Sequence, residues 1–171
     1  MRIRMILATV GLVILAGCSD KPAPTAQLAS FNDLNKEFKA ADANTDVGYE
    51  RKTAALDQIW TKYPGRRLEW IKPWLAVMDI DIQCRGLIYS KLQATKWDLE
   101  FSPADRIELG SVVGKAITIE RTNLIQELCK LVEQKKLKVV LPELKIAAGS
   151  RKDGTNKKVL LETIDKLNAL P

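Results

Sequence analysis

Apolar residues recur every three or four positions over most of residues 30–171, the spacing that places them on one face of an α-helix. Ser30 with Asp33 resembles a capping box and predicts the start of a first helix, with an apolar face of Phe31, Leu34, Phe38 and Ala41. A second helix is predicted over residues 47–63, ended by Pro64-Gly65. Its apolar face is Tyr49, Thr53, Leu56, Trp60 and Tyr63. Because the break between the two helices is short, we expect an antiparallel pair.

Residues 66–97 carry two conflicting patterns. A broad apolar face from Pro73 to Gln93 predicts a helix that starts at the proline. The segment Met78–Cys84 instead alternates apolar and polar residues, which is the period of a β-strand. Helix is favoured because no turn signal interrupts the run before Gly86. Asp81 and Arg85, four positions apart, would then form a helical ion pair.

A third region begins at Ser102, with proline and aspartate in the first helical turn. It predicts one helix to about residue 137, with an apolar face of Ile107, Val113, Ile117, Leu124, Leu128 and Leu131. A short extended segment at 139–141 and a polar loop at 149–156 precede a last helix over 156–169. The predicted fold is therefore one all-α domain of about five helices, spanning residues 30–171.

The first eighteen residues have a different pattern. Arg2 and Arg4 precede an apolar run of about eleven residues, which is shorter than the roughly 20 residues that cross a bilayer. A basic start, a short apolar run and small residues at the end are typical of a secretory signal peptide. Its last four residues, Leu15-Ala16-Gly17-Cys18, resemble the lipobox of bacterial lipoproteins.

This resemblance implies that residues 1–17 are a signal peptide and that Cys18 becomes the lipidated first residue of the mature chain. Several acyl chains on one residue give a stable membrane anchor. In the sorting rule of these lipoproteins, aspartate directly after the cysteine retains the protein in the inner membrane. Here Ser19 holds that position, which implies delivery to the outer membrane, facing the periplasm. Pro22 and Pro24 predict that residues 18–29 form a flexible tether.

The charge of the chain is uneven. The formal net charge is +6, and loss of Arg2 and Arg4 with the signal peptide leaves about +4. Most of this excess lies in residues 130–158, which suggests an anionic neighbour such as lipid headgroups or lipopolysaccharide. The candidate anion-binding residues are Lys135, Lys136, Lys138, Arg151, Lys152, Lys157 and Lys158. The alternative is a solvated lysine-rich surface without a ligand.

Cys84 and Cys129 remain after Cys18 is assigned to the lipid. An even pair in an oxidising compartment predicts a disulfide bond. It would close a loop of about 46 residues and stabilise the domain by roughly 4 kcal/mol in the chain-entropy model. The alternative is two buried free thiols.

The chain contains no histidine. This removes the commonest general base, the usual nucleophile–histidine pairs and most zinc sites. The sequence also lacks a phosphate-binding loop. Asp105 and Glu108 could share a helix face, but they are typical of the acidic residues in a first helical turn. We therefore expect no catalytic residues, metal, cofactor or nucleic-acid partner.

Aromatic residues gather around residues 60–97, with two arginines among them. Aromatic side chains combined with arginine are common anchors of protein interfaces. The candidate partner-binding residues are Arg66, Arg67, Trp70 and Trp74. The alternative is that the tryptophans simply pack in the core.

These observations favour a lipid-anchored envelope lipoprotein that acts as a non-enzymatic protein-interaction module, for example an inhibitor, an immunity protein or an assembly factor. The second hypothesis is a module that binds anionic lipid or lipopolysaccharide through residues 130–158. A small cell-wall hydrolase is the third.

Overall fold

The structure, a computed structural model, describes residues 30–76 and 81–171. Every regular element in these ranges is helical, which confirms the all-α prediction, although nine α-helices replace the five predicted. The elements are α1 (Phe31–Ala40), α2 (Asp46–Lys62), η1 (Pro64–Arg66), α3 (Arg67–Ala76), α4 (Ile82–Ala94), α5 (Trp97–Glu100), α6 (Pro103–Ile119), α7 (Leu124–Gln134), η2 (Lys138–Val140), α8 (Leu141–Gly149) and α9 (Thr155–Asn168).

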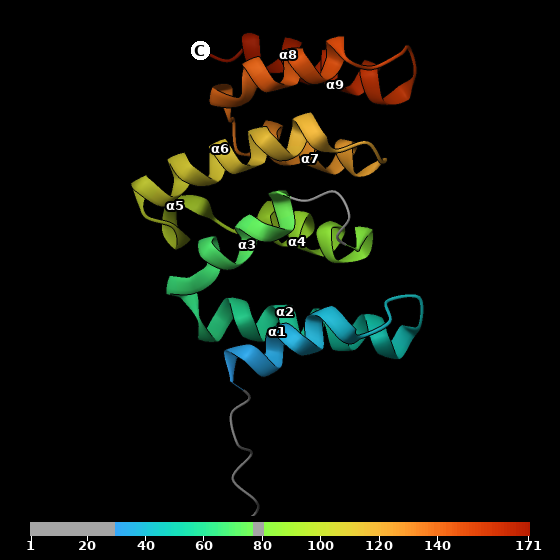
Figure 1. The fold of residues 1–171 in the computed structure, drawn as a ribbon. Helices are drawn as coiled ribbons and strands as arrows, with labels where there is room; N and C mark the ends of the chain where they lie inside the picture. The colour runs from blue at the N-terminus through green and yellow to red at the C-terminus, as the bar shows by residue number, and fades with distance from the viewer. Residues whose placement is uncertain (1–29, 77–80) are drawn as a thin grey trace, which may run out of the picture.

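The long helices form four hairpin layers stacked along one direction (Figure 1). The layers are α1 with α2, α3 with α4, α6 with α7, and α8 with α9. In one column α3 packs on α6 and α6 on α8, while in the other α4 packs on α7 and α7 on α9. Each layer therefore contacts mainly its neighbours, as in an α-solenoid.

The first layer is attached differently from the others. α2 contacts both η1 and α4, but within the described residues α1 and α3 form no comparable backbone interface. Side chains rather than closely packed backbones therefore connect α1 with α3. One continuous apolar core nevertheless runs through all four layers, from Phe38 in α1 to Leu167 in α9.

Two predicted helix starts are confirmed by their hydrogen bonds. The Ser30 hydroxyl accepts from the Asp33 N–H at 3.2 Å, and the Asp33 carboxylate accepts from the Ser30 N–H, which completes a capping box. The Ser102 hydroxyl accepts from the Asp105 N–H at 3.1 Å. Each cap satisfies backbone donors that the first helical turn cannot satisfy itself.

The single helix predicted over 102–137 is wrong, because the chain turns between α6 and α7 at Glu120. The buried Glu120 carboxylate accepts hydrogen bonds from the N–H and the hydroxyl of Thr122 and forms an ion pair with Arg85. These bonds replace helical ones, while the apolar spacing continues through the turn. Spacing alone cannot distinguish one long helix from two packed helices.

Other local predictions also change. Pro73 lies inside α3 and does not begin a helix, and residues 138–140 form a 3-10 turn where an extended segment was predicted. Ile107 and Tyr49, both predicted on apolar faces, are exposed. The predicted Asp81–Arg85 ion pair does not form, because Asp81 pairs with Lys52 and Arg85 with Glu120. Residues 77–80 of the segment with strand-like alternation lie outside the described ranges.

The predicted disulfide is not formed, since Cys84 and Cys129 are separate buried thiols. Cys84 faces the first layer, where its Sγ lies 3.7 Å from the Phe38 carbonyl oxygen. Cys129 faces the last layer, where it interacts with Thr163 of α9. Although α4 and α7 pack together, their cysteines therefore lie on helix faces directed at different layers.

The lipobox, the cleavage site and the tether lie in residues 1–29, outside the described ranges, and stay predictions. Within the described ranges, no helix combines the length and the hydropathy that crossing a bilayer requires.

Candidate functional site

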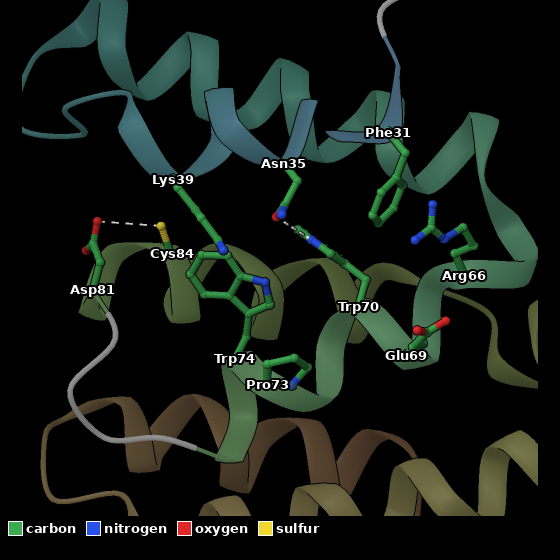
Figure 2. Close-up of a pocket in the computed structure, with 10 residues that line it drawn as sticks. All are labelled: Phe31, Asn35, Lys39, Arg66, Glu69, Trp70, Pro73, Trp74, Asp81 and Cys84. Carbon is green, nitrogen blue, oxygen red and sulfur yellow. Dashed lines mark hydrogen bonds between the residues drawn. The ribbon is translucent and has the colours of Figure 1, made fainter. Parts of the chain in front are cut away.

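A cavity of about 460 Å³ lies between α1 and α3, where the first two layers are held apart. This volume is in the lower part of the range of small-ligand sites. It has room for a small molecule or a few side chains. The lining residues are Phe31, Asn35, Lys39, Arg66, Glu69, Trp70, Pro73, Trp74, Asp81 and Cys84 (Figure 2).

The aromatic floor of the cavity comes from α3. Trp70 and Trp74 are one helical turn apart, so both indoles extend from the same side of α3 toward α1 (Figure 2). Each ring meets the buried Phe38 edge-on, with centroid distances of 5.3 Å for Trp70 and 5.0 Å for Trp74. The two indoles are thus held rigidly by the core of the first layer.

Arg66 closes one end of the cavity. Its guanidinium stacks on the ring of Phe31 at 3.7 Å from the centroid, and Phe31 in turn meets Tyr63 edge-on. This stacking of a cation on an aromatic face orients the guanidinium without neutralising its charge.

The indole N–H groups of the four tryptophans differ in whether they have a hydrogen-bond partner. The indole N–H groups of Trp60, Trp70 and Trp97 donate to Glu100, to Asn35 and to the Leu92 carbonyl oxygen. The indole N–H of Trp74 has no hydrogen-bond partner among the described residues, although the residue is only 4% exposed.

The Trp74 N–H also remains accessible. Within the described residues, the only fully enclosed side-chain polar atom without a partner is Oε2 of Glu143. Since Trp74 lines the cavity, a ligand in the cavity can reach its indole N–H. An indole N–H is a donor only, so a bound ligand with an acceptor can pair with it.

Two cations, Lys39 and Arg66, and two carboxylates, Glu69 and Asp81, line the cavity. Lys39 extends over the Trp74 ring at 5.7 Å from its centroid, and Lys36 lies one turn earlier on the outer side of α1. Within the described residues, neither lysine nor Arg66 forms an ion pair. Glu69, likewise without an ion pair there, lies at the Arg66 end of the cavity (Figure 2), while Lys36 lies near the carboxylate of Asp33.

At the other end, the charge of Asp81 is already matched. Its carboxylate lies 3.6 Å from the ammonium of Lys52 and accepts a hydrogen bond from the Gln83 N–H at 2.8 Å. These interactions outweigh partial burial and lower the pKa of Asp81, so the group is ionised at neutral pH. Lys52 is fully buried and also donates to the Phe38 carbonyl oxygen at 2.6 Å, near the end of α1.

Cys84 lies beside this cluster but is a poor nucleophile. Burial raises the pKa of its thiol to about 11, so the thiolate is scarce at neutral pH. Together with Asp81 and Lys52, Cys84 therefore supports the end of α1.

The structure brings together three of the four predicted partner-binding residues. Arg66, Trp70 and Trp74 line the cavity, whereas Arg67 is buried and points away from it. The Arg67 guanidinium donates to the Trp60 carbonyl oxygen at 2.7 and 2.8 Å and pairs with Glu100 at 3.1 Å. Arg67 therefore joins α2, α3 and α5 structurally.

The predicted anion-binding residues do not form one surface. Lys135 donates to the carbonyl oxygens of Gln93 and Thr95, each at 2.7 Å, and Lys138 donates to those of Leu170 and Pro171. Both lysines cap chain segments within the fold. Lys158 pairs with Glu162 along α9, and Lys136 lies in the turn that follows α7.

A depression of about 360 Å³ lies at the start of α9. It is lined by Arg121 and by the other three predicted anion-binding residues, Arg151, Lys152 and Lys157. Arg151 is held by the carbonyl oxygens of Ala147 and Glu120. Burial and the neighbouring charge of Arg121 lower the pKa of Arg151. Lys157 is partly neutralised by Asp153 at 3.0 Å.

Sequence analysis missed the α1 side of the cavity. Phe31 was predicted as a core residue, and Asn35 and Lys39 were not singled out. They lie on the side of α1 next to its apolar face, and only the separation of α1 from α3 exposes them to a cavity. The sequence also did not indicate that Lys52 is buried, because a lysine on a helix is normally exposed.

Comparison with protein-family models, with curated proteins and with solved structures finds no match to this chain. The function is therefore argued from the geometry of the site.

Proposed function

We propose that this protein is a lipid-anchored, non-enzymatic interaction module of the bacterial outer membrane, facing the periplasm. Its binding site is the cavity between α1 and α3. The observation that carries this proposal is a rigid aromatic floor combined, at one cavity, with two cations and an indole N–H that have no partner among the described residues. The membrane address rests on the lipobox resemblance of residues 15–18.

The occupant that best fits the cavity is a short linear segment of another envelope protein, acidic and carrying an aromatic or large apolar side chain. A volume of about 460 Å³ is too small for a folded surface element but accommodates a few side chains. The two indoles offer flat apolar contact, and tryptophan and arginine are the residues that most often dominate binding energy. Lys39 and Arg66, which form no ion pair among the described residues, favour an acidic segment.

Site-specific photocrosslinking tests this proposal. A photoreactive amino acid replaces Asn32, an exposed residue of α1 beside the cavity, in the full-length protein expressed in its own envelope. We expect one protein to be captured, through a short acidic segment identified by mass spectrometry. Trp70→Ala should abolish the capture, whereas Leu161→Ala, an exposed position on α9, should not change it. Capture that persists in the Trp70→Ala variant would refute the cavity as the binding site.

The second candidate function is binding of anionic headgroups at the depression formed by Arg121, Arg151, Lys152 and Lys157. The specific observation that favours it is the proximity of Arg121 to Arg151, two cations that a bound anion would stabilise together.

Vesicle flotation distinguishes the second candidate from the first. Anionic vesicles should bind the protein at low salt and lose it as salt rises, because exposed charges are screened. Arg121→Gln and Lys152→Gln should each reduce binding, while Lys145→Gln on α8 serves as the charge-matched control. Equal binding by all three proteins would exclude the depression.

A further inference from the structure

We infer that the cavity recognises a carboxylate adjacent to an aromatic or large apolar side chain. This inference rests on the proposed function, because it names the chemistry of the segment that would enter the same cavity. It follows from the donors and acceptors that the cavity presents and from the groups that already have partners.

The free polar groups of the cavity wall are mainly donors. The Trp74 indole N–H has no partner among the described residues. Asn35 uses its side-chain oxygen to accept from the Trp70 indole at 2.9 Å, which leaves the NH₂ group of its amide as a donor. The Lys39 ammonium extends over the Trp74 ring, on the same side of the cavity (Figure 2).

A ligand that satisfies these groups needs several acceptor lone pairs on one small group. A carboxylate offers about four such positions on two oxygens, while an amide or hydroxyl offers fewer and carries no charge. Hydrogen bonds to an ionised acceptor are also about twice as strong as neutral ones. Phosphate would fit the charge, but Glu69 at the rim and Asp81 at the far end oppose a second negative charge.

The apolar part of the ligand has a defined place beside this polar group. Trp70, Trp74, Pro73 and Phe31 provide most of the wall, and the aromatic rings are held by edge-on contacts with the core. Such preformed surfaces bind an aromatic or branched side chain with little loss of flexibility in the protein.

The test uses defined probes against the purified full-length protein in detergent. The probes are acetyl-Gly-Gly-Phe with a free C-terminal carboxylate, its C-terminal amide, acetyl-Phe-Glu-amide, acetyl-Phe-Gln-amide and decanoate. Tryptophan fluorescence titration measures binding, and two-dimensional NMR of the indole N–H signals locates it.

We expect the carboxylate member of at least one peptide pair to bind at least tenfold more tightly than its amide and to shift the Trp74 indole N–H signal. The C-terminal pair and the glutamate–glutamine pair distinguish a chain-end carboxylate from an acidic side chain. Lys39→Met should remove most of this preference, and Trp74→Phe should reduce it. Lys145→Met is the control of equal charge, and Glu69→Gln should not weaken binding.

Lys39 is exposed, so its replacement leaves the fold intact even if the Trp74 variant proves unstable. Equal affinity for each acid and its amide would overturn the carboxylate inference while leaving the cavity as a peptide site. Tighter binding of decanoate than of any peptide would overturn it in favour of a fatty acid. If no probe binds and crosslinking captures no partner, the proposed function itself fails.

Discussion

The least typical residues of the core are Arg85 and Glu120, which form a buried ion pair between α4 and the end of α6. The Glu120 carboxylate also accepts hydrogen bonds from Thr122, and its backbone carbonyl accepts one from Arg151. One acidic residue therefore holds together the α6–α7 turn, α4 and the end of α8. A buried pair of this kind costs desolvation free energy, so its value depends on both partners being present.

Arg85→Met should lower the free energy of unfolding by about 3–5 kcal/mol, because it leaves the Glu120 charge buried without a cation. Urea denaturation followed by circular dichroism measures the loss. As a control, Lys158→Gln, which removes the exposed Lys158–Glu162 pair, should cost less than about 1 kcal/mol. The double variant Arg85→Met, Glu120→Gln should lose less than the two single losses combined. Strict additivity would contradict the coupling.

The two buried thiols should make the protein sensitive to alkaline pH. Burial raises the pKa of Cys84 and of Cys129 to about 11, against an ordinary value of 9.0. Above pH 9 the unfolded chain releases these protons first, so the free energy of unfolding should fall as pH rises from about 9 to 11. Burial beside Glu120 also raises the pKa of Tyr89, which adds to the loss. Urea titrations at several pH values measure this slope.

The variant Cys84→Ala, Cys129→Ala should show a smaller fall over the same pH range. Peptide mapping after alkylation provides an independent check on the disulfide. Both cysteines should resist iodoacetamide in the folded protein at pH 8 and react fully in urea without a reductant. Failure of both to react in urea would show that a disulfide does form.

At the scale of elements, α6 illustrates how packing decides the role of a glycine. Gly110 and Gly114 are one turn apart on the face that meets η2 and α8. A methyl group at Gly110 would lie 3.2 Å from Val139, a largely exposed side chain that can move. At Gly114 it would lie 3.2 Å from Glu143 and 3.4 Å from Val140, which is buried.

Gly110→Ala should therefore stabilise the protein by up to about 1 kcal/mol, the difference in helix propensity between glycine and alanine. Gly114→Ala gains the same propensity but must displace the Glu143 side chain, whose Oε2 is enclosed and has no partner among the described residues, so it should stabilise less or destabilise. Thermal denaturation measures both, since 1 kcal/mol shifts Tm by about 2–4 °C in a protein of this size. A larger gain at Gly114 than at Gly110 would contradict the packing argument.

At the scale of the whole molecule, the layered arrangement makes stability local. In a stack of hairpins, each layer is stabilised mainly by its immediate neighbours. Among the described layers, the first contacts one neighbour and is attached to it mainly through α2. The cavity therefore lies at the weakest junction among the described layers, where a ligand can be accommodated with small adjustments.

Phe38→Leu should accelerate hydrogen exchange in α1 and α2 while leaving α8 and α9 unchanged. Phe38 is fully buried and joins α1 to both tryptophans of α3, so its loss weakens mainly the first junction. The reciprocal control is Leu160→Ala in α9, which should accelerate exchange in α8 and α9 alone. Hydrogen exchange with mass spectrometry measures both variants. Uniform acceleration along the chain in both variants would show one cooperative unit in place of local layers.

The sequence by itself determined the class of fold and several helix ends. The signals were the apolar spacing of three and four residues, the caps at Ser30 and Ser102 and the helix end at Pro64-Gly65. All of them depend on interactions between residues close in sequence, so the sequence pattern contains them. It also indicated Arg66, Arg67, Trp70 and Trp74 as a group, because aromatic side chains combined with arginine are common interface anchors.

Only the tertiary structure decided the partners of distant residues. In the structure, Cys84 and Cys129 face different layers. Arg67 is buried and donates to the Trp60 carbonyl oxygen. Lys135 and Lys138 donate to carbonyl oxygens of other segments. The structure also places Lys39 and Asn35 of α1 across from Trp74 of α3. The physical reason is that the sequence pattern sets which face of each helix is apolar, while stacking sets which other helix that face meets.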